Sequence, residues 1–180
     1  SQTVNPGANV TFTVSASGTA PLTYQWSFNG ANISGATTSS LVKNNVQSGD
    51  AGNYAVIVGN VAGSATSANA ALSVNVPPSI TTQPSSQTVN PGANVTFTVS
   101  ASGTAPLTYQ WRLNAANISG ATASSFTKSN AQSGDAGNYS VVVANVVCNE
   151  TTATAVYTVD VPLSIPADLP IQTVNPGANV

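Results

Sequence analysis

Two lysines are the residues whose type and spacing most nearly suggest chemistry in this sequence. Lys43 and Lys128 are its only lysines, and they stand 85 positions apart. A buried lysine with a depressed pKa can attack an asparagine side chain and form an internal isopeptide crosslink, provided that a carboxylate lies beside it. The alternative, which we favour, is a lysine whose stem covers apolar surface while its amine reaches water. An intact mass that matches the unmodified sequence would exclude the crosslink.

No other set of residues predicts catalysis or a cofactor. The chain has no histidine, so it lacks the usual general base. Asp50 and Asp135 each open an Asp-Ala-Gly turn, where the carboxylate is expected to cap backbone N–H groups. One such carboxylate per repeat is too few for a calcium site. The acidic residues form no motif-like pair; they are Asp50, Asp135, Glu150, Asp160 and Asp168. We therefore expect no enzymatic activity, no cofactor and no bound metal.

A single cysteine, Cys148, excludes an internal disulfide. It stands where the first copy of the internal repeat has Gly63, in a turn between strands. Two interpretations remain open: an intermolecular disulfide from an exposed thiol, or a tolerated change in a variable loop.

The composition excludes several classes of partner. Only 4% of the residues are charged, and the net charge is −2 with three basic residues. Such a chain cannot assemble a basic patch for nucleic acid or for an anionic membrane surface. No apolar run approaches the roughly 18 residues that span a bilayer, so we expect no membrane insertion. Because the chain has few titratable groups, we expect its behaviour to change little with pH and salt, which suits an exposed, extracellular setting.

An internal repeat of 85 residues organises the chain. Residues 1–26 are identical to residues 86–111, and residues 172–180 are identical to residues 2–10. We expect three segments. They are repeat 1 (1–76), repeat 2 (77–161) and a tail (162–180) that is a linker with the first strand of a third repeat or a donated strand.

Each repeat is expected to be a small all-β domain built around one tryptophan. Pro21–Trp26 alternates apolar and polar residues, which is the period of a strand with one buried face. Asn29–Gly30 favours a tight hairpin after it; repeat 2 has Asn114–Ala115 there, so glycine at the second position is not obligatory. A strand is expected over residues 53–60 and the last one over residues 68–74. About seven short strands with regular turns predict a two-sheet sandwich.

The residues that carry a resemblance are Val10-x-Phe12-x-Val14, Tyr24-Gln25-Trp26 and Asp50-Ala51-Gly52-Asn53-Tyr54-Ala55-Val56. Together they resemble the I-set immunoglobulin-like domain, and more narrowly its cysteine-free tandem form in large bacterial surface and secreted proteins. The resemblance covers essentially the whole chain and implies tandem immunoglobulin-like sandwiches.

The resemblance also implies roles for single residues. Trp26 and Trp111 would be the core tryptophans, and Tyr54 and Tyr139 the tyrosine-corner residues. The disulfide of the family would join Val14 to Val56 and Val99 to Val141, but all four are valine, so neither bond can form. Lys43 and Lys128 stand where the family usually has a second inward apolar residue.

The function that these features favour is a non-enzymatic structural or adhesive array, a stalk or fibre-forming unit of a large extracellular bacterial surface protein. Its expected partners are copies of itself or neighbouring repeats. The prolines of Val74–Ile80 favour an extended, semi-rigid connection. The alternatives are a carbohydrate- or protein-binding accessory module of a secreted enzyme, with a surface glycan or protein as ligand, and an immune-type receptor ectodomain.

The two ends of the sequence add a further hypothesis. Repeat 1 lacks the segment equivalent to Pro78–Ser85, and residues 163–180 supply such a segment with no domain behind it. The sequence can be a window of a longer array. Alternatively, the tail of one molecule completes repeat 1 of the next and builds a head-to-tail filament.

Overall fold

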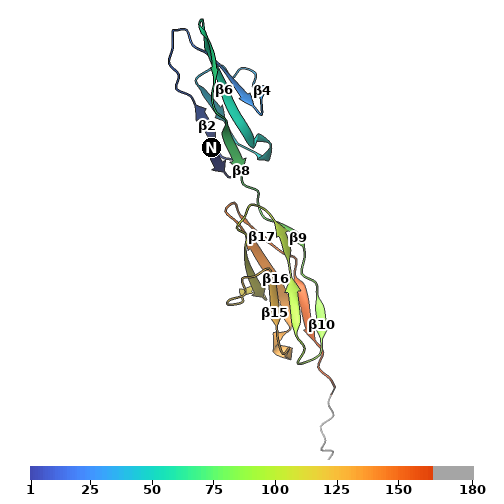
Figure 1. The fold of residues 1–180 in the computed structure, drawn as a ribbon. Helices are drawn as coiled ribbons and strands as arrows, with labels where there is room; N and C mark the ends of the chain where they lie inside the picture. The colour runs from blue at the N-terminus through green and yellow to red at the C-terminus, as the bar shows by residue number, and fades with distance from the viewer. Residues whose placement is uncertain (164–180) are drawn as a thin grey trace, which may run out of the picture.

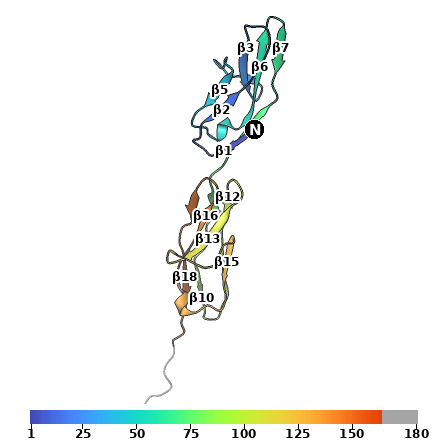
Figure 2. The same cartoon turned by 90° about the vertical axis from the view of Figure 1, so that its left-hand side faces the viewer.

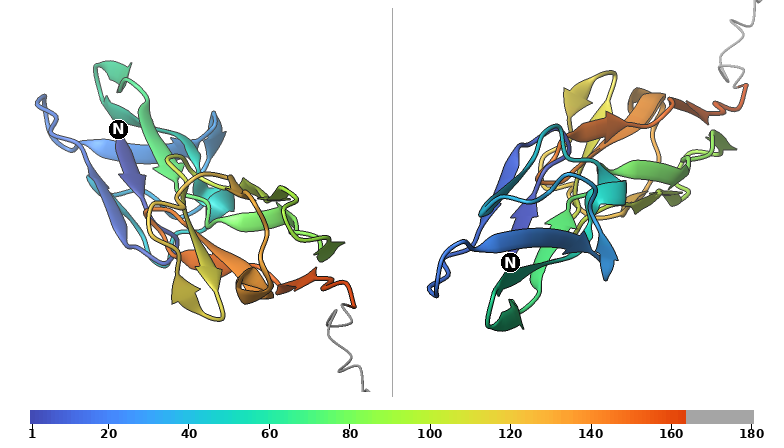
Figure 3. Two further views of the ribbon diagram at one scale, coloured as in Figure 1. Left: turned by 90° about the horizontal axis from the view of Figure 1, so that it is seen from below. Right: turned by 90° about the horizontal axis from the view of Figure 1, so that it is seen from above.

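The computed structural model describes residues 1–163, which form two β-sandwiches arranged end to end (Figures 1 and 2). Seen along the long axis, repeat 1 lies partly over repeat 2 and is offset to one side (Figure 3). The expected third-repeat or donated-strand segment lies, from residue 164 onward, outside the described residues. Within residues 1–163 no helix is long and apolar enough to cross a membrane.

Repeat 1 is built from eight short strands and one turn of 3-10 helix. The strands are β1 (Gln2–Val4), β2 (Val10–Thr13), β3 (Thr23–Phe28), β4 (Ala31–Asn32), β5 (Ser40–Lys43), β6 (Gly52–Asn60), β7 (Gly63–Thr66) and β8 (Ala70–Val74). The 3-10 turn, η1 (Ser48–Asp50), connects β5 to β6.

Repeat 2 follows the same plan with two additional strand segments near its start. Its elements are β9 (Ser79–Thr82), β10 (Gln87–Val89), β11 (Val95–Thr98), β12 (Ser100–Ser102), β13 (Thr108–Leu113), β14 (Ala116–Asn117), β15 (Ser125–Lys128), η2 (Ser133–Asp135), β16 (Gly137–Ala144), β17 (Asn149–Thr151) and β18 (Ala155–Val159). The extra pair, β9 and β12, is antiparallel and has no counterpart in repeat 1.

The larger sheet of each sandwich has the strand order β1-β8-β6-β3-β4 in repeat 1 and β10-β18-β16-β13-β14 in repeat 2. In each of these sheets, the strand that comes first in the sequence pairs in parallel with the strand that comes last, β1 with β8 and β10 with β18. The opposing layer contains β2 with β5, or β11 with β15. The core between the layers follows from the period-2 alternation of the strands, because every second side chain faces inward.

Stacked aromatic rings occupy the middle of each core. The ring centroids of Phe12 and Tyr54 are 4.5 Å apart, and those of Phe97 and Tyr139 are 4.8 Å apart. Such pairs stabilise a core beyond the area that they bury. Trp26 packs beside the first pair, with its centroid 6.2 Å from that of Phe12.

Three details differ from, or add to, the sequence expectations. The last strand of repeat 1 begins at Ala70 rather than at residue 68, because β7 and β8 both pair with β6 and the chain between them is irregular. The strands β1 and β7 were not expected, since both are short and mostly exposed. The Asn114–Ala115 turn keeps the left-handed geometry of Asn29–Gly30: φ is 69° at Ala115 and 85° at Gly30.

Candidate functional site

The two tryptophans lie at the centres of the sandwiches. Trp26 is 3% exposed and Trp111 is 0% exposed. Each indole N–H donates a 2.9 Å hydrogen bond to a backbone carbonyl, that of Thr38 in repeat 1 and that of Ala123 in repeat 2. The polar edge of each buried ring is therefore satisfied, as a buried indole requires.

The four valines at the disulfide positions differ in how deeply they are buried. Val56 and Val141 are fully buried, and Val99 is 5% exposed. Val14, the equivalent of Val99, is only half-buried. In repeat 2, β9 pairs with β12 directly after Val99 and Ile80 packs against the core, and the described part of repeat 1 contains no counterpart of β9.

Tyr54 is buried and forms a corner with the turn that precedes its strand. Its hydroxyl donates a 2.9 Å bond to the carbonyl oxygen of Asp50, four residues upstream. The Asp50 carboxylate accepts a bond from the backbone N–H of Gln47 at 2.9 Å and pairs with the Lys43 ammonium at 2.8 Å. Strand, turn and ion pair are thereby joined in one network.

Repeat 2 contains the same network with the same geometry. Tyr139 donates to the Asp135 carbonyl at 3.0 Å, Gln132 N–H donates to the Asp135 carboxylate at 2.9 Å, and the Lys128 ammonium lies 2.8 Å from that carboxylate. The network explains why a lysine ends this strand in both repeats. Sequence reasoning missed the pairing because β5 and η1 meet only in the fold.

The pKa shifts in these networks have clear causes. The Gln47 N–H and the Lys43 ammonium lower the pKa of the Asp50 carboxyl, and the bond to Asp50 raises the pKa of Lys43. In repeat 2 the Lys128 ammonium lowers the pKa of Asp135. An isopeptide crosslink requires a neutral amine, and the raised pKa of Lys43 opposes that state. The crosslink therefore stays a hypothesis, with no support from the charge environment.

Cys148 is exposed, in the turn between β16 and β17. The Asn145 side-chain oxygen accepts two bonds in this turn, from Val147 N–H at 2.9 Å and from Cys148 N–H at 3.4 Å. No group of three or more potential metal-ligating side chains occurs within residues 1–163.

The junction between the repeats is held by hydrogen bonds to Val76. Its N–H donates to the Thr104 hydroxyl at 2.7 Å, and its carbonyl oxygen accepts from Thr104 N–H at 3.0 Å. The Asn145 side-chain amide donates to the same carbonyl at 2.7 Å and to the Thr104 carbonyl at 3.1 Å. Both backbone groups of one linker residue are thus bound to repeat 2.

Two further contacts tighten this junction. A Cβ at Gly103 would lie 2.8 Å from the carbonyl oxygen of Pro77 and 3.0 Å from the Cα of Pro78, so only glycine allows this approach. From the other side, the Asn5 amide of repeat 1 donates to the Val146 carbonyl of repeat 2 at 3.3 Å. Gly103, Thr104 and Asn145 have identical counterparts in repeat 1, but the sequence does not show that the three act together. Their common role in binding the linker is seen only in the folded structure.

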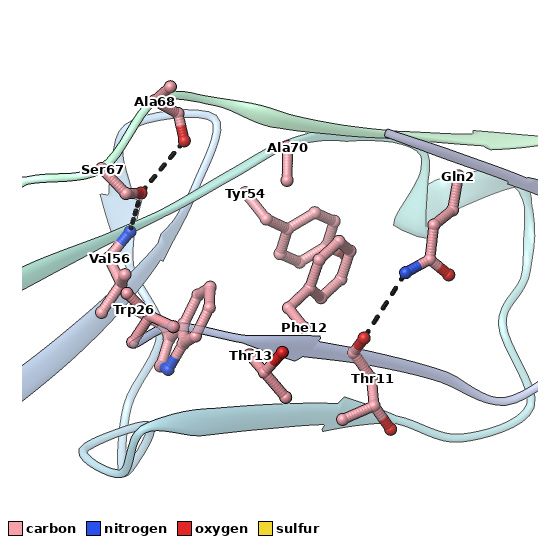
Figure 4. A pocket seen from close by; sticks show the side chains of 11 residues that line it. Gln2, Thr11, Phe12, Thr13, Trp26, Tyr54, Val56, Ser67, Ala68 and Ala70 are labelled. Atoms are coloured by element: carbon pink, nitrogen blue, oxygen red, sulfur yellow. Dashed lines mark hydrogen bonds between the residues drawn. The ribbon is translucent and has the colours of Figure 1, made fainter. Parts of the chain in front are cut away.

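A second feature is a hollowed surface on repeat 1. Three adjoining pockets of about 270, 350 and 280 Å³ lie there, each lined by residues of repeat 1 alone. Figure 4 shows side chains that line the first of them, among them the rings of Phe12, Trp26 and Tyr54. The Ser67 hydroxyl also lines it, and it accepts a bond from Val56 N–H and donates one to the Ala68 carbonyl. We call this surface the edge groove; the residues that define it are Val14, Ser15, Ala16, Ser17, Val58, Ala65, Thr66 and Ser67.

In repeat 2 the segment that begins with β9 covers the equivalent surface. The equivalents of Val58 and Ala70 in the core of repeat 2, Val143 and Ala155, are both 0% exposed, whereas Val58 and Ala70 are half-buried. Within the described residues, a strand covers this surface in repeat 2, and none covers it in repeat 1.

Comparison with known proteins agrees with this architecture. The family model described as "Immunoglobulin domain" matches residues 1–60 and 77–145. An I-band fragment of titin superposes with a TM-score of 0.74 at 21% identity, over 88% of this chain and 62% of that one.

Two further tandem structures are similar. Extracellular domains 3–5 of Drosophila OTK match with a TM-score of 0.56 and 22% identity, over 89% of this chain and 59% of that chain. The N-terminal four Ig domains of a Dscam1 isoform match with a TM-score of 0.55 and 20% identity, over 88% and 43%. The chain spans less than two thirds of each of these structures, and at such identities the likeness concerns the fold. With the family model matching most of its length, the chain belongs to the immunoglobulin domain family, as two sandwiches in tandem.

Proposed function

We propose that this chain is a structural segment of a non-enzymatic array in a large extracellular protein, in which I-set-type sandwiches stacked end to end form a stalk or a fibre. The repeats lack the disulfide cysteines of the family, and this pattern favours a bacterial surface protein as the source. The observation that carries the proposal is the bound linker: both backbone groups of Val76 are hydrogen-bonded to repeat 2. A stalk has to keep its length, and a fixed junction is what keeps two domains in line.

The character of the junction supports this role over a flexible tether. Domains joined by a free linker change their relative orientation easily. Here Asn145 and Thr104 bind the linker from repeat 2, and Gly103 lets the prolines pack directly against that domain. Each of these groups lies on repeat 2, so the domain itself sets the direction in which the preceding repeat leaves.

The remaining surface supports a structural role more than a chemical one. The three pockets of repeat 1 are lined without a charged residue. The aromatic rings that a glycan-binding module would present for stacking are largely engaged with each other in the cores. An accessory binding module is for this reason the weaker candidate.

The fixed junction is tested by measuring how widely the distance between the two repeats varies. Spin labels at Ala31→Cys and Ala116→Cys, in a Cys148→Ser background, report this distance by pulsed electron paramagnetic resonance. We expect a narrow distribution that broadens in Asn145→Ala. The matched control is Asn60→Ala, the same change at the equivalent position of repeat 1, whose side-chain amide binds the Thr19 carbonyl and makes no bond to Val76. It should leave the distribution narrow. An equally broad distribution in the parent chain and in Asn145→Ala would refute the fixed junction.

A further inference from the structure

The hairpin that joins β3 to β4 contains the one Asn-Gly dipeptide of the sequence, Asn29–Gly30. Both residues are exposed, and among the described residues nothing lies within 4 Å of a Cβ built on Gly30. Repeat 2 has Asn114–Ala115 at the same place, with φ of 48° at Asn114 against 47° at Asn29. The two hairpins therefore share one backbone geometry, and they differ in whether a Cβ stands beside the asparagine.

An asparagine followed by glycine is chemically labile, because the next backbone nitrogen can attack its side chain. The Gly30 nitrogen loses its proton to hydroxide and forms a bond to Cγ of Asn29, while the Cγ–Nδ2 bond breaks and ammonia leaves with a proton taken from water. A water molecule then opens the resulting succinimide ring at either carbonyl and gives aspartate or isoaspartate. The net reaction converts an amide and water into a carboxylic acid and ammonia, without a change of oxidation state. The Cβ of an alanine crowds the attacking nitrogen, which a glycine leaves open.

The folded hairpin holds Asn29 away from this reaction. Its φ of 47° lies in the left-handed region. There ψ is about +47°, which places the following nitrogen opposite the side chain across the Cα–C bond. That bond has to rotate by roughly half a turn from this region before the Gly30 nitrogen can reach Cγ. Because the closed hairpin does not allow such a rotation, the reaction requires a local opening.

Contacts with the start of β6 keep the asparagine in this conformation. The Asn53 N–H donates to Oδ1 of Asn29 at 2.9 Å, and the Asn29 N–H donates to the Asn53 carbonyl at 2.8 Å. The side-chain amide lies directly against Gly52, where a Cβ would stand 2.7 Å from Oδ1 and 2.8 Å from Nδ2. We call these contacts the asparagine clamp. Repeat 2 has the same clamp, in which the Asn138 N–H donates to Oδ1 of Asn114 at 3.0 Å.

We propose that Asn29 is a site of spontaneous modification, which becomes aspartate or isoaspartate at a rate set by how often the asparagine clamp opens. Short strands at the edge of a sheet open locally more often than the whole domain unfolds. The clamp of Asn114 opens in the same way, but Asn114 reacts far more slowly because Ala115 crowds the attacking nitrogen. The modification is thus confined to one of two repeats that share the same hairpin geometry.

The isoaspartate product changes the hairpin in a way that refolding does not reverse. Its main chain runs through Cγ, so the turn gains a backbone atom and the side chain loses the methylene that carries its carbonyl to the Asn53 N–H. The clamp cannot close again in its original form, and the modified repeat keeps a looser β3–β4 edge. Ala115 is strained at φ 69°, but it spares repeat 2 this ageing.

Peptide mapping by mass spectrometry measures the reaction in the full chain. The chain is incubated at mildly alkaline pH, in buffer and in parallel in urea that unfolds both repeats. In the folded chain Asn29 should gain the mass that the exchange of NH₂ for OH brings, and Asn114 should stay intact over the same period. Hydrogen exchange of the Asn53 N–H reports the opening of the same clamp. The factor by which folding slows the modification of Asn29 should therefore equal the factor by which folding slows this exchange.

Two substitutions test the attacking nitrogen, and each should act against its effect on stability. Gly30→Ala puts a strained residue in the turn and loosens repeat 1, yet it should stop the modification of Asn29. Ala115→Gly relieves the strain of repeat 2, yet it should make Asn114 a second site. Stability alone predicts the opposite result in both cases.

A second pair of substitutions tests the clamp. The Cβ added by Gly52→Ala displaces the Asn29 amide, so it should speed both the modification of Asn29 and the hydrogen exchange of Asn53. The matched change Gly137→Ala opens the clamp of repeat 2 and should still leave Asn114 intact.

Three results overturn the proposal. The first is equal modification of Asn29 and Asn114 in the full chain, and the second is an Asn29 that reacts as fast in the folded chain as in urea. The third is an Asn114 that stays intact in Ala115→Gly after the Asn138 N–H has exchanged, and this result does not depend on whether Gly52→Ala folds. The distance between the repeats is measured separately, so the proposed function is unaffected by these outcomes.

Discussion

Two buried tyrosines of repeat 2 offer a sharp test of how hydrogen bonding stabilises this fold. Tyr139 and Tyr157 are 2% and 1% exposed, and their ring centroids are 5.7 Å apart in the same core. The Tyr139 hydroxyl donates to the carbonyl of Asp135 at 3.0 Å. The Tyr157 hydroxyl is fully buried and has no hydrogen-bond partner among the described residues. Phenylalanine at either position removes one oxygen and keeps the ring.

The two substitutions should change the free energy of unfolding in opposite directions. Tyr139→Phe removes a bond and leaves a carbonyl with one partner fewer, which costs about 1–2 kcal/mol. Tyr157→Phe removes a buried hydroxyl that gave up its water without gaining a partner, so it should stabilise by about 1–2 kcal/mol. The contacts of the Tyr157 ring with Phe97, at a centroid distance of 6.0 Å, remain in place.

Urea unfolding followed by Trp111 fluorescence measures both effects. A Trp26→Phe background removes the signal of repeat 1, so the transition reports on repeat 2. With a slope of about 1–2 kcal/mol per molar urea, each change should move the midpoint by about 0.5–2 M, downward for Tyr139→Phe and upward for Tyr157→Phe. If Tyr157→Phe lowers the midpoint as far as Tyr139→Phe does, the reasoning from the unpartnered hydroxyl is refuted.

Three further predictions concern the turn, the ion pair and the core. Ala115→Gly should raise the stability of repeat 2 by about 0.5–1 kcal/mol, because alanine is strained at φ 69°, and Gly30→Ala should lower the stability of repeat 1. Urea unfolding measures both changes. Midpoints equal to those of the unsubstituted chain would contradict the strain. The melting temperature, measured by calorimetry, should not change between about pH 5 and pH 9. Because the pKa of Asp50 is lowered, its ion pair loses stability only as pH falls below the ordinary carboxyl value of about 3.9, and because the pKa of Lys43 is raised, the pair loses stability only as pH rises beyond about 10.4. A step in the melting temperature near neutral pH would contradict the assignment. Val56→Asp puts an unpaired carboxylate in a position that is 1% exposed and should unfold repeat 1. Circular dichroism measures this, and a variant that stays soluble and folded would refute it.

The fold could be predicted from the sequence because its strongest signals are local. The alternation around Trp26 and Trp111, and the fixed block from Asp50 to Tyr54, each describe one strand or one corner. Two copies of the same pattern made the period unambiguous. Those signals need no knowledge of which loop approaches which strand.

The candidate sites could be predicted only in part, because they depend on contacts distant in the sequence. The lysine that interrupts an apolar pattern is explained by Asp50, seven residues away and on another element. Asn145 has no local signal for binding Val76, which lies 69 residues upstream.

The parallel pairing of the outer strands determines how each sandwich responds to tension. In repeat 1, residues 2–4 lie beside residues 72–74, and in repeat 2 residues 87–89 lie beside residues 157–159. Because the strands are parallel, a pull on the two ends of a repeat slides one strand lengthwise along the other. The hydrogen bonds of this pair run across the direction of the pull, so they carry the load together instead of opening one after another. A chain of such units would resist stretching until a whole bonded patch fails at once, and its extension would then proceed in discrete steps, one domain at a time.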